Sequence, residues 1–191
     1  LIIANDCELE NIKIFLLKGS VIIGKNTIIS NGEMATSSII YIEHGTVKIE
    51  DHVRLRCSKI MVRYNGVLAI DRYTNINEYS EIRCDENIKI GKYTQISYNV
   101  NIWDTNTHCI FPSHKRRLLA EKHFPLLGYD GEKPVTIPVL IGDDCWIGKD
   151  SSIMKGCHIG NECIIGFHTI LINKQIPEGK TVTNSIDLKI M

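Results

Sequence analysis

The chain has 191 residues, and its 22 lysines and arginines equal its 22 aspartates and glutamates, so the formal net charge is zero. This length allows one domain with a sizeable core and does not demand two. The balanced charge creates no field to attract nucleic acid or an anionic membrane, and no apolar stretch approaches the roughly 20 residues that a membrane span needs. We therefore expect a single domain over residues 1–191 without a nucleic-acid partner or a membrane span.

Cysteine usage indicates the redox setting. The seven cysteines are an odd number and contain no CxxC pair, which argues against a disulfide framework. A reduced, cytoplasmic setting fits better. Because residue 1 is leucine, we expect the natural chain to begin upstream.

Aliphatic residues recur every sixth position over residues 10–102, in sets separated by short insertions. These sets are Ile23 and Ile29; Ile49 and Leu55; Ile70, Ile76, Ile82 and Ile88; and Ile90, Ile96 and Ile102. Small residues such as Thr74 and Thr94 stand between them. The spacing predicts irregular coils of a solenoid that begins near residue 10.

The pattern stops after Ile102 and resumes at Val139. The interval contains His108, His114 and His123, and the basic run Lys115-Arg116-Arg117. A loop of this length inside a compact domain is commonly functional. We expect an active-site loop over residues 103–138.

The most regular repeats occupy residues 139–176, where the pattern is aliphatic-Gly-x-x-small-x. Aliphatic residues stand at Ile141, Ile147, Ile153, Ile159, Ile165 and Leu171, and small ones at Cys145, Ser151, Cys157, Cys163 and Thr169. A helix of period 3.6 does not space apolar residues this way. Three short strands joined by tight corners do, with the aliphatic and small side chains inside and glycine allowing the turns.

The sequence therefore predicts an all-β fold, a parallel β-helix with coils of about 18 residues and one long protruding loop. Cys145, Cys157 and Cys163, at the small positions of the repeat, are expected inside the coil as compact apolar groups. No long helix is expected, and residues 177–191 form a C-terminal tail.

The segment Ile141-Gly-Asp-Asp-Cys-Trp-Ile-Gly148, followed by regular hexads and preceded by a histidine-bearing loop, resembles the hexapeptide-repeat acetyltransferases. The subgroup it resembles acetylates sugar hydroxyls and includes maltose, galactoside and capsular sialic-acid acetyltransferases. This resemblance implies a left-handed β-helix, against the usual right-handed rule. It also implies acetyl-CoA as donor, a carbohydrate acceptor, and a homotrimer with active sites between subunits.

The resemblance also implies roles for individual residues. His108 matches the catalytic base, and Trp146 matches a donor to the oxyanion. Asn106 stands where many relatives carry an acid, so either Asp104, the nearest carboxylate, or a backbone carbonyl is expected to orient His108. Matches to acetyl-CoA contacts are Lys149, Phe167, Asn173 and Lys174. Matches to acceptor contacts are Asn77 and Asp85. Arg116 and Arg117 match no motif, and contact with an acidic acceptor, contact with the CoA phosphates or a solvated loop would each account for them. No metal is expected.

Three alternatives stay open at this point. An amino-sugar N-acetyltransferase uses the same kind of base and groove. A zinc lyase of the carbonic-anhydrase type needs three histidines around one ion, and the histidines here lack that family's spacing. A scaffold without chemistry leaves the long histidine-bearing loop unexplained.

Overall fold

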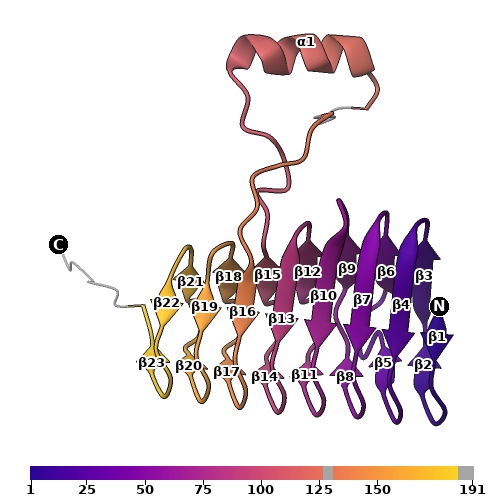
Figure 1. Cartoon of the computed structure of the whole chain (residues 1–191), viewed down its shortest axis with the longest axis vertical. Helices are drawn as coiled ribbons and strands as arrows, with labels where there is room; N and C mark the ends of the chain where they lie inside the picture. Colours follow the sequence, from indigo (N-terminus) through magenta and orange to yellow (C-terminus); the bar gives the residue numbers. More distant parts are fainter. Residues whose placement is uncertain (127–130, 185–191) are drawn as a thin grey trace.

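The computed structural model describes residues 1–126 and 131–184. The chain winds as a left-handed parallel β-helix, a triangular coil with one parallel sheet on each face (Figure 1). Seven successive coils each pass through sheet A, then sheet B, then sheet C, and a last described coil adds a strand to sheets A and B. The predicted all-β solenoid is confirmed.

The described strands divide among the three sheets. Sheet A contains β1 (Ile2–Ile3), β4 (Gly19–Ile23), β7 (Gly45–Ile49), β10 (Gly66–Ile70), β13 (Asn87–Ile90), β16 (Val139–Ile141), β19 (His158–Ile159) and β22 (Gln175–Ile176). Sheet B contains β2 (Glu8–Glu10), β5 (Ile28–Ser30), β8 (Arg54–Leu55), β11 (Asn75–Ile76), β14 (Gln95–Ile96), β17 (Trp146–Ile147), β20 (Ile164–Ile165) and β23 (Thr181–Val182). Sheet C contains β3 (Ile12–Leu16), β6 (Ser38–Ile42), β9 (Lys59–Val62), β12 (Glu81–Cys84), β15 (Asn101–Trp103), β18 (Ser152–Met154) and β21 (Ile170–Leu171).

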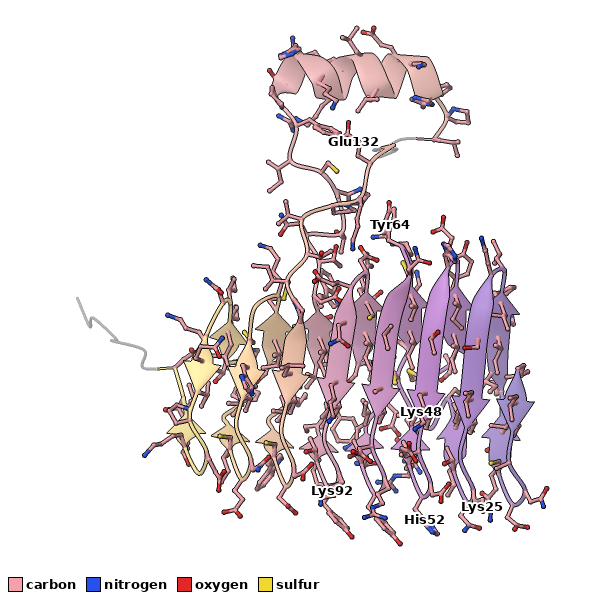
Figure 2. The ribbon with its side chains drawn as sticks, viewed as in Figure 1. Lys25, Lys48, His52, Tyr64, Lys92 and Glu132 are labelled. Carbon is pink, nitrogen blue, oxygen red and sulfur yellow. The ribbon has the colours of Figure 1, made fainter. Side chains whose placement is uncertain are left out.

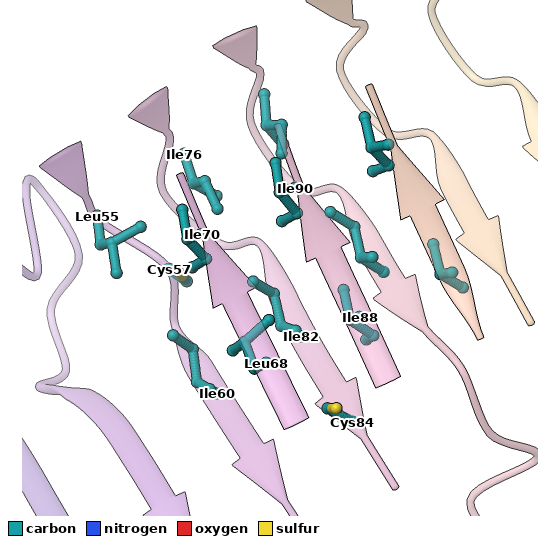
Figure 3. Close-up of a cluster of buried hydrophobic side chains, with 14 of the residues drawn as sticks. Leu55, Cys57, Ile60, Leu68, Ile70, Ile76, Ile82, Cys84, Ile88 and Ile90 are labelled. Carbon is teal, nitrogen blue, oxygen red and sulfur yellow. The ribbon is translucent and has the colours of Figure 1, made fainter. Parts of the chain in front are cut away.

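Aliphatic side chains from the six-residue positions fill the interior, each one stacked on its counterpart in the next coil (Figure 3). Ile70 pairs with Ile90, 20 residues further on, whereas Ile141 pairs with Ile159, 18 residues further on. The expected coil length is therefore right for the C-terminal coils and too short for the central ones. The difference arises because strands such as β10 have five residues where β19 has two.

The small positions of the repeat also point inward, as predicted. Cys145, Cys157 and Cys163 have at most 1% of their surface exposed, and all seven cysteines are free thiols. Burial raises the pKa of the Cys145 and Cys157 thiols. These cysteines are therefore packing groups and are not activated as nucleophiles.

The glycines of the repeat serve close packing between coils. A Cβ on Gly142 would lie 2.7 Å from the backbone nitrogen of Asn161. We expected glycine to allow the tight turns, but a left-handed backbone occurs at other corner residues such as Asp144, at φ 56°. The Asp144 N–H donates to the Lys92 carbonyl of the preceding coil at 2.9 Å. A hydrogen bond between coils thus accompanies the left-handed corner.

The coil extends beyond the expected limits at both ends. Strand β1 begins at Ile2 and pairs with β4, so the start near residue 10 is wrong. Strand β23 pairs with β20, so the coil runs through Val182 and the tail does not begin at residue 177. Short end strands that bury few side chains leave a weak apolar pattern, which explains both errors. Residues 185–191 of the predicted tail lie outside the described residues.

The interruption is confirmed, because β15 ends at Trp103 and β16 begins at Val139. It contains helix α1 (Ser113–His123), so the expectation of no long helix is wrong. The helix buries none of its residues, and without a buried face it has no apolar periodicity to reveal it. Among the described residues, no helix is long and apolar enough to cross a membrane.

Replacing Gly142 with alanine tests the packing role of the repeat glycines. The added Cβ would overlap the backbone at Asn161, and we expect a loss of about 1–3 kcal/mol in the free energy of unfolding. Chemical denaturation followed by circular dichroism measures it. Ser152→Ala, on the outer face of β18, is the control and should change stability by less than about 0.5 kcal/mol. Equal midpoints for the two variants would contradict the packing role.

Candidate active site

The loop leaves the coil at the corner between sheets C and A and carries α1 away from the coil surface (Figure 1). Its two ends run side by side as a short stalk. Thr105 and Thr136 form an antiparallel bridge, the Asn106 N–H donates to the Val135 carbonyl at 3.0 Å, and the Ile137 N–H donates to the Asp104 carbonyl at 2.9 Å. Strand-like pairing therefore fixes the segment that precedes His108.

Asp104 anchors this stalk to the coil. Its side chain is fully buried, one oxygen accepts the Asp85 N–H at 2.8 Å, and the other accepts the N–H groups of Glu86 at 2.8 Å and Asn87 at 2.7 Å. Burial raises the pKa of Asp104, while the three backbone donors oppose that shift. Because backbone groups occupy both oxygens, the geometry does not support the predicted role of Asp104 in orienting His108.

A buried ion pair forms a second anchor. Asp85, whose side chain is 1% exposed, receives two hydrogen bonds from the Arg63 guanidinium at 2.9 and 2.7 Å and one from the Thr105 hydroxyl at 2.7 Å. Arg63 also donates to the Thr107 carbonyl at 3.2 Å. The expectation that Asp85 contacts the acceptor sugar is therefore corrected, since its oxygens are buried and engaged. Arg63 lies outside the repeat positions and the loop, so no pattern in the sequence predicts this role.

Further contacts hold the outer part of the loop to the coil and to helix α1. Figure 2 shows Tyr64 close to Glu132, and the Tyr64 hydroxyl donates to the Glu132 carbonyl at 3.4 Å. The Glu132 carboxylate pairs with Lys115 at 2.8 Å. The loop is thus held at several points along its length.

His108 is exposed on this stalk. The backbone N–H of His108 donates to the Asn106 carbonyl at 2.7 Å. Thr107 before it has a left-handed backbone, φ 64°, and its N–H donates to the Thr105 hydroxyl at 2.9 Å. A tight turn therefore presents the histidine at the surface of the loop.

Trp146 lies on β17 in sheet B, with 59% of its surface exposed. Sheet B is the face opposite the corner from which the loop leaves (Figure 1). A single chain therefore does not bring Trp146 and His108 together. Trp146 instead lines a hollow with the predicted acceptor residue Asn77, together with Asn75, Gln95 and Ser97.

The predicted acetyl-CoA contacts fall into two exposed pairs. Lys149 and Phe167 follow β17 and β20, at the corner between sheets B and C, whereas Asn173 and Lys174 precede β22, at the corner between sheets C and A. Lys149 lines a hollow with Tyr79, Tyr98, Asn99 and Asp150. The structure does not assemble the four residues into one site within a single chain.

The basic run lies on α1. Arg116 and Arg117 are exposed, and their predicted contact with an acidic acceptor stays a prediction. Lys115 stacks over Phe111, with its nitrogen 3.6 Å from the ring centre, in addition to its pairing with Glu132. Within residues 1–126 and 131–184, no group of three or more histidine, cysteine or acidic side chains is arranged to hold a metal ion.

Residues 138–173 match the model of the bacterial transferase hexapeptide family, described as six repeats. This segment of the chain contains the hexapeptide repeat. The fold of the chain is similar to that of the polysialic acid O-acetyltransferase OatWY, with a TM-score of 0.68 at 22% identity over 95% of this chain and 75% of the other. The polySia-specific acetyltransferase NeuO gives 0.59 at 17% identity over 94% of this chain and 82% of the other. At these identities the two structures show the fold alone.

Two curated relatives of the chain are acetyltransferases by name. The putative lipopolysaccharide biosynthesis O-acetyl transferase WbbJ of Escherichia coli K12 is 29% identical over 66% of this chain. The probable acetyltransferase Rv3034c of Mycobacterium tuberculosis is 25% identical over 82% of this chain. The chain spans 60% and 45% of their respective lengths.

Replacing Asp104 with asparagine separates an anchoring role from a catalytic one. The amide offers a single oxygen, so at least one buried N–H at residues 85–87 loses its partner, and we expect a loss of about 1–3 kcal/mol in the free energy of unfolding. Chemical denaturation of this variant and of the exposed control Asp144→Asn checks it. An Asp104→Asn protein of unchanged stability and reduced turnover would favour the catalytic role instead.

Proposed function

We propose that this chain is an acetyl-CoA-dependent O-acetyltransferase that acts on a hydroxyl group of a sugar or polysaccharide. The observation that carries the proposal is the position of His108, exposed on an anchored stalk where a hexapeptide-repeat coil is interrupted. The name of the Escherichia coli relative, an O-acetyl transfer protein of lipopolysaccharide biosynthesis, supports the reaction type.

The proposed reaction is direct transfer in a ternary complex. The imidazole of His108 takes the proton of the acceptor hydroxyl as its oxygen attacks the carbonyl carbon of the thioester. The carbon–sulfur bond then breaks, and the imidazolium returns the proton to the leaving thiolate. A base of this kind contributes roughly 10²–10⁴-fold in rate, and histidine titrates in the range that both proton transfers require.

Trp146 is the proposed donor to the oxyanion. Its indole side chain is exposed on sheet B. One well-placed donor to a developing oxyanion lowers the activation barrier by about 3 kcal/mol. The buried cysteines are not needed in this scheme, because no acyl-enzyme forms. Burial raises the pKa of Cys57 to about 12, which keeps that thiol protonated at neutral pH.

The separation of His108 and Trp146 within one chain supports an assembly in which the site is shared. We infer a homotrimer in which the loop of one copy reaches sheet B of the next, so that both residues face one acceptor. In such an arrangement Lys149 and Phe167 at one corner, and Asn173 and Lys174 at another, hold the phosphates and adenine of acetyl-CoA from two copies.

The exposed surface of the loop supports assembly. Helix α1 buries none of its residues on its own chain, and apolar side chains around it are exposed, among them Ile110 at 87%, Phe124 at 74% and Leu118 at 62%. Apolar groups gathered on a projecting arm commonly mark an interaction surface.

Sheet C adds a second apolar surface. Its outward side chains align in register from β3 to β18, in the order Phe15, Tyr41, Met61, Arg83, Trp103 and Met154. The Arg83 guanidinium stacks over Trp103, 4.6 Å from the ring centre. This stripe suits burial against another copy better than the polar outer face of sheet B.

Replacing His108 with alanine tests the base. We expect acceptor-dependent release of CoA thiol to fall by roughly 10²–10⁴-fold, with acetyl-CoA binding by calorimetry and the mass in solution unchanged. His158→Ala, an exposed histidine of sheet A outside the loop, is the control. Full activity of the His108→Ala protein would contradict the assignment.

Mixing two inactive variants tests whether the site is shared. In a cyclic trimer, every mixed assembly of His108→Ala and Trp146→Ala chains has one site with both native residues. Random exchange of equal amounts should therefore restore roughly a quarter of the native rate. If both residues acted within one chain, mixing would restore nothing. Each variant alone, taken through the same exchange procedure, is the control.

A further inference from the structure

The outer face of sheet B carries a polar ladder that ends at Trp146. Arg54, Asn75, Gln95 and Trp146 occupy the same position of four successive strands, β8, β11, β14 and β17. The Arg54 guanidinium donates to the Asn75 side-chain oxygen at 2.6 Å, and the Asn75 amide donates to the Asn77 side-chain oxygen at 3.2 Å. Hydrogen-bonding groups thus follow one another along the coil axis.

Aromatic side chains border this ladder on both sides. At the corner between sheets A and B, His52, Tyr73 and Tyr93 stack with ring centres 4.8 and 5.1 Å apart and planes within 2°. Figure 2 shows His52 and Lys92 on this corner, on the side of the coil away from the loop. At the corner between sheets B and C stand Tyr79 and Tyr98, which are 55% and 45% exposed.

Two hollows lie in this region, one over the ladder and one at the corner between sheets B and C. One is lined by Asn75, Gln95 and Trp146, and the other by Tyr79, Tyr98 and Lys149. Amide side chains both donate and accept hydrogen bonds, and aromatic rings offer apolar surface beside a polar tip. This combination suits a sugar residue, which presents hydroxyl groups and C–H faces together.

The repeat of the ladder suits more than one sugar residue. Adjacent strands of a sheet lie about 4.8 Å apart, so similar groups recur at intervals comparable with the length of a pyranose ring. Beyond the neighbour's loop, which we propose reaches this face at Trp146, another copy of the chain fits the ladder poorly. The amides of the ladder would be buried without assured partners, whereas sheet C offers the apolar surface that subunit contacts favour.

We propose that the outer face of sheet B, from β8 to β17, is an acceptor track that binds several consecutive sugar residues of an oligosaccharide or polysaccharide. The track leads the chain of sugars to the hollow beside Trp146. This inference rests on the proposed function, and it extends that function from a single sugar hydroxyl to a polymeric acceptor.

The test is calorimetric binding to the full chain in its assembled form, with two sets of oligosaccharides graded from one to eight residues. One set is the neutral maltooligosaccharides, and the other is acidic α2,8-linked sialic acid. We expect affinity in at least one set to rise by an order of magnitude or more between one residue and four. Asn75→Ala and Gln95→Ala should each weaken binding of the long oligosaccharides by several-fold. The control Lys89→Ala, exposed on sheet A of the same coils, should not.

Affinity independent of length in both sets, or variants that bind as the native protein does, would overturn the track. Binding requires no turnover, so the two proposals fail separately. Length-dependent binding that depends on Asn75 and Gln95, without acetyl transfer, keeps the track and rejects the enzyme. Acetyl transfer that depends on His108, without any dependence on acceptor length, keeps the enzyme and rejects the track.

Discussion

In-register stacking of each coil on the one before it is the constraint on which the rest of this structure depends. An interior residue such as Ile76 lies against Ile96 of the next coil, and it contributes to the core only if both coils keep the same phase. The same contact requires a glycine such as Gly142 where two backbones approach closely. It also accounts for corner residues such as Asp144, whose left-handed backbone directs an N–H to the preceding coil.

A coil closed in this way leaves few places for an insertion. A long insertion within a strand would interrupt its pairing with both neighbouring coils, and here the additional segment leaves at a corner, between β15 and β16. Its root is then fastened by groups that the coil supplies. Asp104 caps three backbone donors, and Arg63 connects the buried Asp85 with the carbonyl that precedes His108. Rigidity at the root allows the outer loop to be exposed without losing the position of its histidine.

The geometry of a triangular coil also decides which groups can meet. A residue at the corner between sheets C and A and a residue on sheet B are separated by the whole cross-section of the coil, as His108 and Trp146 are here. If both serve one reaction, as we propose, a second copy must supply one of them. The polar outer face of sheet B and the apolar one of sheet C then suit different partners, a glycan and a neighbouring subunit.

The sequence by itself determined the repeat, the position of the interruption and the inward place of the cysteines, because burial in a stacked coil imposes a period that is visible residue by residue. It did not reveal α1, which buries none of its residues, nor the first coil at Ile2 and the last at Val182, whose strands are short. Only the tertiary structure decided the roles of Asp85 and Asp104. Asp104 was predicted from its place near His108 and Asp85 from its match to acceptor contacts. A one-dimensional pattern does not distinguish a carboxylate that faces a ligand from one enclosed by backbone donors or by an arginine. The same limit applies to Arg63, Tyr73 and Tyr93, whose partners lie one or two coils away and become neighbours only when the coil closes.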